Sequence, residues 1–206
     1  MHPNTGFRWT DTEAMLALIR DVGFARVFAQ TEAGPRVAHV PVLVRAGPDG
    51  AHVLHFHLAN GNALASRIDG VVALAVIEGP NAYLSANWYA DVRGAVPTWN
   101  YLAVECEGPV RRLDRAALTE LVDDLATQLE PTVGEDWTRA KMEPARFAAM
   151  LGAITAFEMS ITDLRGTHKV SQNKSAVEAA RVIHAMEAVG ADEMAAAILA
   201  ARGGGA

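Results

Sequence analysis

The pattern of hydrophobic and polar positions along this chain predicts a sheet with short helices set between its strands. Strand-like runs occur at 23–30, 36–45, 52–58, 71–77, 82–88, 99–113 and 154–161. Apolar residues spaced three and four apart predict helices at 11–22, 62–69, 114–130, 144–151, 175–189 and 191–202. This order is not a regular βαβ alternation, so it favours an α+β class: an antiparallel β-barrel with peripheral helices and a C-terminal helical pair.

Residues 36–45 and 52–58 predict a hairpin through the turn GPDG at 47–50. The even-numbered residues from Ala38 to Val44 and from Leu54 to Leu58 are apolar, so matching these faces fixes the register by parity. The second face then carries His39, Pro41, His55 and His57. That face is neither plainly polar nor plainly apolar, and 71–77 is apolar on both sides, so both faces should be covered. A small barrel covers only its inside, and we therefore expect a homodimer.

The length and net charge of the chain limit the number of domains and the kinds of partner that we expect. The 206 residues predict a single domain, 1–206, with 164–206 as its C-terminal helical extension. The net charge is −6 and no basic run exceeds Arg111–Arg112, which disfavours direct DNA binding. No apolar run reaches the roughly 18 residues of a membrane helix, and the first residues do not resemble a signal peptide, so a cytoplasmic location is expected.

The sequence offers few candidates for a disulfide, a metal site or a common catalytic motif. Cys106 is the single cysteine, which excludes an internal disulfide, and its place in a strand predicts a buried thiol. His52 points away from His55 and His57 by parity, so interface or ligand-facing imidazoles are favoured over a metal site. The sequence contains no GxSxG, HExxH or Walker motif.

The segment THKVSQNKSAVE at 167–178 predicts a helix N-terminus, because Ser175 and Glu178 form a capping-box pattern. Lys169 and Lys174 flank its amide-rich start, where helix N–H groups and ammonium groups favour an anion such as phosphate. A well-capped helix with solvated lysines is the favoured alternative. The segment HLANGNALASRID at 57–69 carries a weaker signal of the same kind.

The stretch GAVPTWNY at 94–101 begins the longest strand. Alternation places Trp99 and Tyr101 on one face and Asn100 on the other. Two aromatics at a strand edge are more often packing or interface residues, although a flat ring system would also fit against them.

Three ordered motifs, GPNAYLSANWY (79–89), VPTWNY (96–101) and KVSQNK (169–174), resemble the PaiB-like family of FMN-binding negative transcriptional regulators. The resemblance extends over nearly the whole chain. It implies a Greek-key split β-barrel of the pyridoxamine-phosphate-oxidase type, and a homodimer with flavin mononucleotide (FMN) bound between subunits. The family is named for repression of genes for sporulation and degradative enzymes.

The resemblance also implies cofactor-binding residues, position by position. Those that match the family's motifs are His39, His57, Asn62, Trp99, Asn100, Lys169, Gln172 and Asn173. Ser66 and Arg67 are added because relatives usually carry Trp followed by Lys or Arg near this point.

The function expected from this resemblance is a redox-linked negative transcriptional regulator. The alternative is a flavin-dependent oxidase or reductase of a small substrate. A repressor that contacts DNA directly through the C-terminal helices is disfavoured: residues 181–202 carry Arg181 and Arg202 against Glu187, Asp192 and Glu193.

Overall fold

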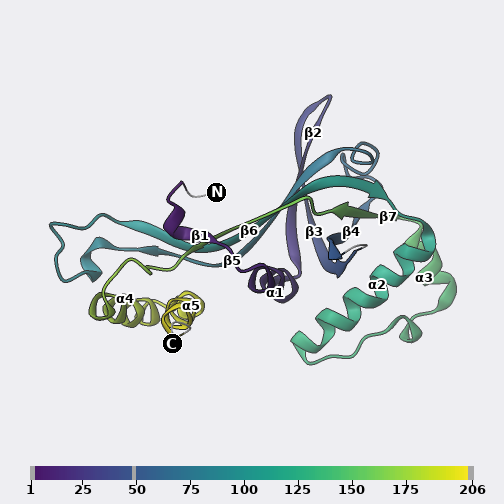
Figure 1. Cartoon of the computed structure of the whole chain (residues 1–206). Coiled ribbons are helices and arrows are strands. Elements are labelled where there is room, and N and C mark those ends of the chain that lie inside the picture. Colours follow the sequence, from purple (N-terminus) through teal and green to yellow (C-terminus); the bar gives the residue numbers. More distant parts are fainter. Residues whose placement is uncertain (1–2, 48–49, 204–206) are drawn as a thin grey trace. The chain divides into compact units, whose positions relative to one another are not determined.

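The computed structural model describes residues 3–47 and 50–203 (Figure 1). Its strands are β1 (Arg8–Trp9), β2 (Phe24–Thr31), β3 (Gly34–Ala46), β4 (His52–Ala59), β5 (Val72–Leu84), β6 (Thr98–Arg112), β7 (Ile154–Ser160) and β8 (Asp163–Lys169). Its helices are α1 (Thr12–Val22), α2 (Arg115–Leu129), α3 (Pro144–Leu151), α4 (Ala176–Ala188) and α5 (Asp192–Gly203). Short 3-10 turns are η1 (Thr5–Phe7), η3 (Ala86–Trp88), η4 (Glu130–Val133) and η5 (Arg139–Lys141). The predicted α+β class and antiparallel sheet are confirmed.

The strand order closes most of the sheet into a barrel. The order is β1-β8-β6-β5-β2-β3-β4-β7, and β6 also pairs with β7, so the run from β6 to β7 forms a ring. Gly108 lies where these two strands meet. A Cβ at this position would stand 1.7 Å from the carbonyl oxygen of Ser160, so only glycine permits this approach.

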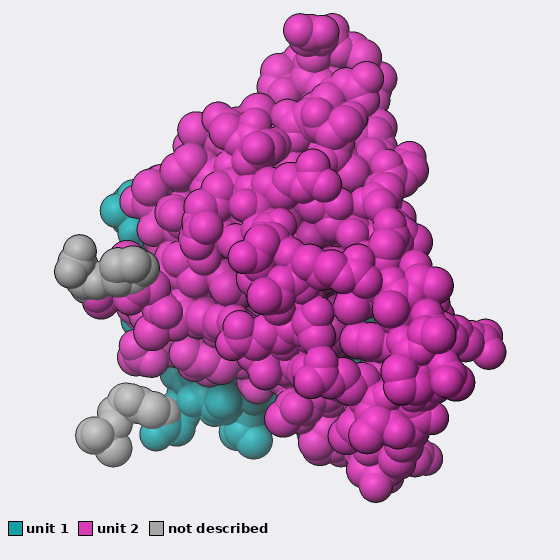
Figure 2. Space-filling view, turned by 90° about the vertical axis from the view of Figure 1, so that its right-hand side faces the viewer, with its two compact units in different colours: residues 1–11, 78–104, 165–206 teal, residues 12–77, 105–164 magenta. Residues whose placement is uncertain are grey.

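The chain packs into two compact units, coloured separately in Figure 2. Unit 1 consists of residues 1–11, 78–104 and 165–206, and unit 2 of residues 12–77 and 105–164. The division falls within β5, β6 and β8. The single domain over 1–206 stays a prediction.

In unit 2, the predicted hairpin of β3 and β4 is confirmed. Val42 lies opposite Phe56 and Val44 opposite Leu54, as parity required. Residues 48–49 of the predicted turn lie outside the described residues. The second face of this hairpin carries Leu43, which packs in a core cluster with leucines of α2 and α3. Part of the face predicted to be a subunit interface is thus covered by the chain's own helices (Figure 1).

Three local predictions are wrong. Residues 62–69 form successive turns rather than a helix, because the Asn62 side chain accepts a hydrogen bond from the backbone N–H of Leu64 at 2.9 Å. The strands predicted at 71–77 and 82–88 are replaced by one strand, β5, which continues through Pro80 to Leu84, and residues 86–88 form η3. Pro80 lies beyond the Leu74–Val76 stretch that pairs with β2, so its missing N–H costs that pairing nothing. The run at 154–161 is not the last strand, since β8 follows it.

In unit 1, α4 and α5 form the predicted helical pair, with Gly190 at a φ of 76° between them. No helix among the described residues is both long enough and apolar enough to cross a membrane.

Candidate anion-binding site

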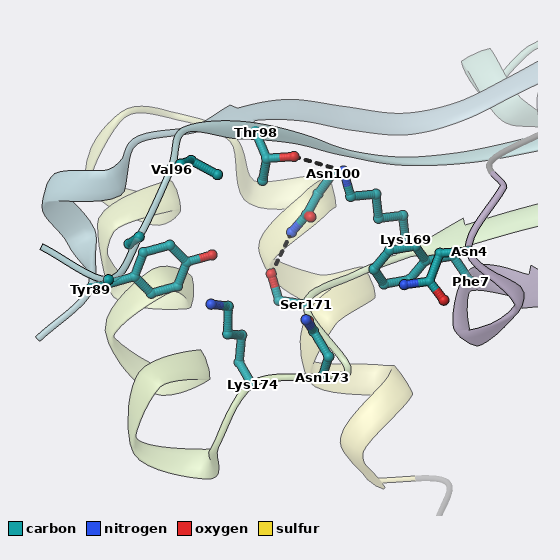
Figure 3. Close-up of a pocket in the computed structure, with 12 residues that line it drawn as sticks. Asn4, Phe7, Tyr89, Val96, Thr98, Asn100, Lys169, Ser171, Asn173 and Lys174 are labelled. Carbon is teal, nitrogen blue, oxygen red and sulfur yellow. Dashed lines mark hydrogen bonds between the residues drawn. The ribbon is translucent and has the colours of Figure 1, made fainter. Parts of the chain in front are cut away.

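A pocket of about 280 Å³ lies within unit 1 (Figure 3). Its walls come from η1, the connection between η3 and β6, the start of β6, and the loop between β8 and α4. The lining residues are Asn4, Phe7, Tyr89, Gly94, Ala95, Val96, Thr98, Asn100, Lys169, Ser171, Asn173 and Lys174. They include two lysines and neither aspartate nor glutamate, so the described lining is positively charged.

The two lysines are held by different contacts. The Lys169 ammonium donates a hydrogen bond to the Thr98 hydroxyl at 2.7 Å and lies 5.6 Å from the ring centre of Phe7. The Lys174 ammonium lies 4.1 Å from the ring centre of Tyr89. Figure 3 shows that its nitrogen points to the same side of the pocket as the Tyr89 hydroxyl. Cation–π contact leaves the ammonium's N–H donors available to an anion.

Asn100 and Ser171 form the buried floor of the pocket. The Asn100 side-chain amide donates to the Ser171 hydroxyl at 2.8 Å, and both residues are almost fully buried. Ser171 has a φ of 57°, the left-handed conformation that a residue with a side chain rarely adopts. Such strain persists only where surrounding contacts hold it, and it concentrates at functional sites.

Two side chains hold the loop that carries Ser171. The Arg202 guanidinium of α5 donates to the carbonyl oxygens of Ser171 at 3.2 Å and Lys174 at 2.7 Å. The Gln172 amide accepts from Val170 N–H at 2.9 Å and donates to the carbonyl oxygens of His168 at 2.6 Å and Gly6 at 3.0 Å. These bonds fix the position of the lysines before a ligand arrives, which lowers the entropy cost of binding.

Tyr89 lines the pocket with an ionisable hydroxyl group. Burial raises the pKa of its hydroxyl, the Glu178 carboxylate raises it further, and a hydrogen bond with the Ser171 side chain opposes both effects. The hydroxyl is therefore neutral at pH 7 and can donate a hydrogen bond. Glu178 itself accepts from Ala90 N–H at 3.3 Å, and the predicted cap of α4 by Ser175 is confirmed.

The structure brings together three of the residues predicted to bind a cofactor. Asn100, Lys169 and Asn173 line the pocket, whereas the Gln172 amide is used in holding the loop. Trp99 alternates to the other face of β6, where it is half exposed. Its indole N–H donates to Asn81 at 3.2 Å.

The other predicted cofactor residues belong to unit 2. His39 is exposed on β3. Arg67 bonds locally, donating to the Ala63 carbonyl oxygen at 3.0 Å and lying 3.5 Å from the Ser66 hydroxyl. Asn62 forms the turn described above. His57 lines a separate, apolar cavity of the same unit. The assignment of all these residues to a cofactor stays a prediction.

Sequence reasoning missed several residues of the pocket. Thr98 was within reach, since alternation places it on the same face as Asn100. Tyr89 and Ser171 lie within the motifs GPNAYLSANWY and KVSQNK but were not singled out. Asn4 carried no signal, because distant segments bring it to the site.

Metal ligation has no support in the described part of the chain. It contains no group of three or more His, Cys, Asp or Glu side chains placed to hold a metal ion. Cys106 is buried, as its strand position predicted.

Comparisons with known proteins identify the family of the chain. Residues 1–163 match the family described as "Putative FMN-binding domain". The chain is 26% identical over 182 residues to "Protease synthase and sporulation protein PAI 2" of Bacillus subtilis, covering 88% of this chain and 86% of that protein.

Solved structures share the fold. The flavocytochrome Anf3 from Azotobacter vinelandii matches with a TM-score of 0.64 and 14% identity, over 87% of this chain and 78% of that chain. The FAD- and heme-binding protein from Mycobacterium smegmatis matches with a TM-score of 0.58 and 16% identity, over 84% of this chain and 78% of that chain. At these identities the likeness concerns the fold alone.

Proposed function

This chain belongs to the FMN-binding domain family that residues 1–163 match, and from that premise we propose that the pocket of Lys169 and Lys174 holds the phosphate of FMN. The family match and the Bacillus subtilis relative confirm the family that the sequence motifs indicated. The observation that carries the proposal is the presence of two lysine side chains in a described lining free of carboxylates.

The donors present fit a phosphate. Lys169 and Lys174 would supply charge-assisted hydrogen bonds, and the Asn173 amide and Tyr89 hydroxyl would supply neutral ones. The volume of about 280 Å³ lies just below the usual range of ligand pockets, which begins at about 300 Å³, so the pocket suits the phosphate-bearing part of FMN and not the whole molecule. FMN supplies redox chemistry when bound, while residues of this chain bind and orient it.

We propose that the bound flavin makes this protein a redox-linked negative regulator of gene expression. The name of the Bacillus subtilis relative refers to protease synthesis and sporulation, which supports a regulatory role. The net charge of −6 favours regulation through a partner over direct contact with DNA. The predicted oxidase or reductase activity remains the alternative.

We also propose a homodimer that buries an apolar row on unit 2. Phe28 of β2 lies opposite Val37 of β3 on one side and Leu74 of β5 on the other. Phe28 is 39% exposed and Val37 43% exposed, so the row presents apolar surface across three strands. A Phe28→Glu variant should shift the mass measured by light scattering from dimer to monomer. Val133→Glu, at a residue of η4 that is 72% exposed, is the matched control.

The phosphate assignment is tested with FMN and riboflavin, which differ only in the phosphate. Fluorescence titration of the wild type should show tighter binding of FMN. Lys169→Met and Lys174→Met keep the side-chain length and remove the charge. Each should weaken FMN binding about 10- to 150-fold, from the loss of about 1.5–3 kcal/mol per charged hydrogen bond, and leave riboflavin unchanged.

The matched control is Lys141→Met, because Lys141 pairs with Asp136 in unit 2. It should bind both flavins as the wild type does. Equal affinity of the wild type for FMN and riboflavin would reject the phosphate site.

Regulation and catalysis are separated by two assays. Transcript levels should rise in cells that carry the doubly substituted Lys169→Met/Lys174→Met protein in place of the wild type. Repeated reduction of the bound flavin by NADPH, with a small oxidant that reoxidises the flavin in each turnover, would instead favour the oxidase or reductase alternative. Cell fractionation tests the predicted cytoplasmic location.

A further inference from the structure

The last helix, α5, is tied to the anion-binding pocket through one side chain. The Arg202 guanidinium, in the final turn of α5, donates to the carbonyl oxygen of Ser171 at 3.2 Å and to that of Lys174 at 2.7 Å. Both of these residues line the pocket, and Figure 3 shows their side chains projecting from the loop toward it. Arg202 is not itself part of the described lining. It therefore acts on the pocket through the backbone of the loop and not by contact with a ligand.

The charge of Arg202 has no carboxylate partner within residues 3–47 and 50–203. Its bonds go to the two carbonyl oxygens, and its Nε is buried without a hydrogen-bond partner in the same part of the chain. A guanidinium keeps its charge in a protein, and a partly desolvated charge is stabilised by an opposite charge nearby. Lys169 and Lys174 add two more positive charges to the same pocket. An anion in the pocket would supply the counter-charge that Arg202 lacks.

Two kinds of contact hold α5 in place. Its inner face buries Met194, Ala195 and Ile198, whereas Leu199 on the outer face is 62% exposed. The apolar contacts therefore hold the middle of the helix, and the bonds of Arg202 hold its last turn. Movement of the last turn would remove two of the bonds that fix the pocket loop.

We propose that α5 and the phosphate pocket are coupled through Arg202: bound FMN holds α5 in its docked position, and docked α5 raises the affinity for FMN. This inference rests on the proposed phosphate site and adds a means of regulating it. The coupling is reciprocal, because a docked helix that favours the ligand is itself favoured by the ligand to the same factor. Occupancy of the pocket is thereby passed to α5, whose outer face is exposed at Leu199. Arg202 and the loop that it holds lie outside residues 1–163, which match the FMN-binding family.

The first test measures the affinity of full-length variants for FMN and riboflavin by fluorescence titration. Arg202→Met should weaken FMN binding about 5- to 150-fold, the usual range of coupling between linked sites, and leave riboflavin unchanged. Arg202→Lys keeps the charge and a donor group, so it should recover part of the affinity for FMN. Leu199→Ala is the matched control on the exposed face of α5, and it should bind both flavins as the wild type does.

The second test follows α5 directly by hydrogen exchange and mass spectrometry, with each flavin held at the same multiple of its Kd. In the wild type, amides of α5 should exchange about 5- to 150-fold more slowly with FMN than with riboflavin. Amides of α2 in unit 2 should exchange equally with both flavins. In Arg202→Met the difference within α5 should vanish. A purely structural role of Arg202 would change exchange in α5 without regard to the phosphate, so this comparison identifies a positioning role.

The exchange comparison in the wild type decides the matter even if Arg202→Met fails to fold. Equal exchange of α5 with the two flavins would overturn the coupling. So would an unchanged FMN affinity of Arg202→Met, provided that the wild type prefers FMN, and either result would leave the phosphate site standing. Equal affinity of the wild type for FMN and riboflavin would instead reject the phosphate site and the coupling together.

Discussion

Glu158 of β7 offers the sharpest test of how unit 2 is held together. Its carboxylate accepts a hydrogen bond from His55 Nε2 at 2.8 Å and another from Arg111 Nε at 2.7 Å. The side chain of Glu158 is 12% exposed, that of His55 11% and that of Arg111 63%. The three residues come from β7, β4 and β6, so this network joins strands on both sides of β7.

The Glu158→Gln substitution removes the charge and one acceptor oxygen. The exposed Arg111 can return to water at little cost, so the loss falls mainly on the buried His55. A hydrogen bond to a charged group contributes about 1.5–3 kcal/mol, which gives the expected decrease in the free energy of unfolding. For a chain of 206 residues this corresponds to a decrease in Tm of about 3–12 °C.

The pH dependence identifies the charge as the cause. Burial raises the pKa of Glu158, but the hydrogen bonds from Arg111 and His55 outweigh it, and the net pKa is below the ordinary 4.5. A carboxyl group with a lowered pKa stabilises the fold above its unfolded pKa, and this contribution is lost as pH falls through the folded value.

The assay is urea unfolding of the flavin-free protein at several pH values. The difference between wild type and Glu158→Gln should be largest at pH 7 and shrink below pH 4.5. Glu120→Gln is the control. Glu120 is 67% exposed and 3.7 Å from an Arg45 that also pairs with Asp124, so its loss should cost under about 1 kcal/mol. A difference at Glu158 that stays constant down to pH 3.5 would refute the reasoning.

Substitutions at three further positions test the backbone and its hydrogen bonds. Gly108→Ala should destabilise the fold by more than about 3 kcal/mol in urea unfolding, because its Cβ would overlap the Ser160 carbonyl oxygen; a wild-type midpoint would contradict this close approach. Ser171→Ala should cost about 1–3 kcal/mol by leaving the Asn100 amide unpaired, and Ser171→Gly should cost about 1 kcal/mol less because it relieves the positive φ. Ser175→Ala should cost about 1 kcal/mol by removing the cap of α4, with helix content measured by circular dichroism.

Periodicity was enough to predict most of the barrel. The observed pairing of Val42 with Phe56 in the β3–β4 hairpin agrees with parity, since a one-residue slip would turn one of the two apolar faces outward. Two errors came from local rules that tertiary context overrides. The runs at 71–77 and 82–88 were predicted as two strands, but β5 continues through Pro80 between them. The 62–69 segment has helical spacing, but the Asn62 side chain satisfies its backbone in a turn.

The pocket was only partly predictable. Lys169 and Lys174 stood out because they flank a helix start, and Asn100 because it alternates with aromatics. The contacts that orient them, such as the Arg202 bonds to the Ser171 and Lys174 carbonyl oxygens, join segments separated by about 30 residues. Single-sequence patterns carry no information on such contacts, since neither hydrophobic period nor turn chemistry encodes them.

The assembly of unit 1 from three separate segments has a consequence for the newly made protein. Its pocket takes Asn4 from the first segment, Asn100 from the second and Lys174 from the third, and Arg202 holds the last of these in place. The pocket therefore cannot form on the ribosome until Arg202 has been synthesised and has emerged. At ordinary rates of translation, synthesis of the stretch from Asn100 to Arg202 takes about 5–20 s. During this time the pocket residues up to Asn100 have been made, and those that complete the pocket have not. A nascent chain that stalls before Arg202 would therefore lack the guanidinium that holds the carbonyl oxygens of Ser171 and Lys174.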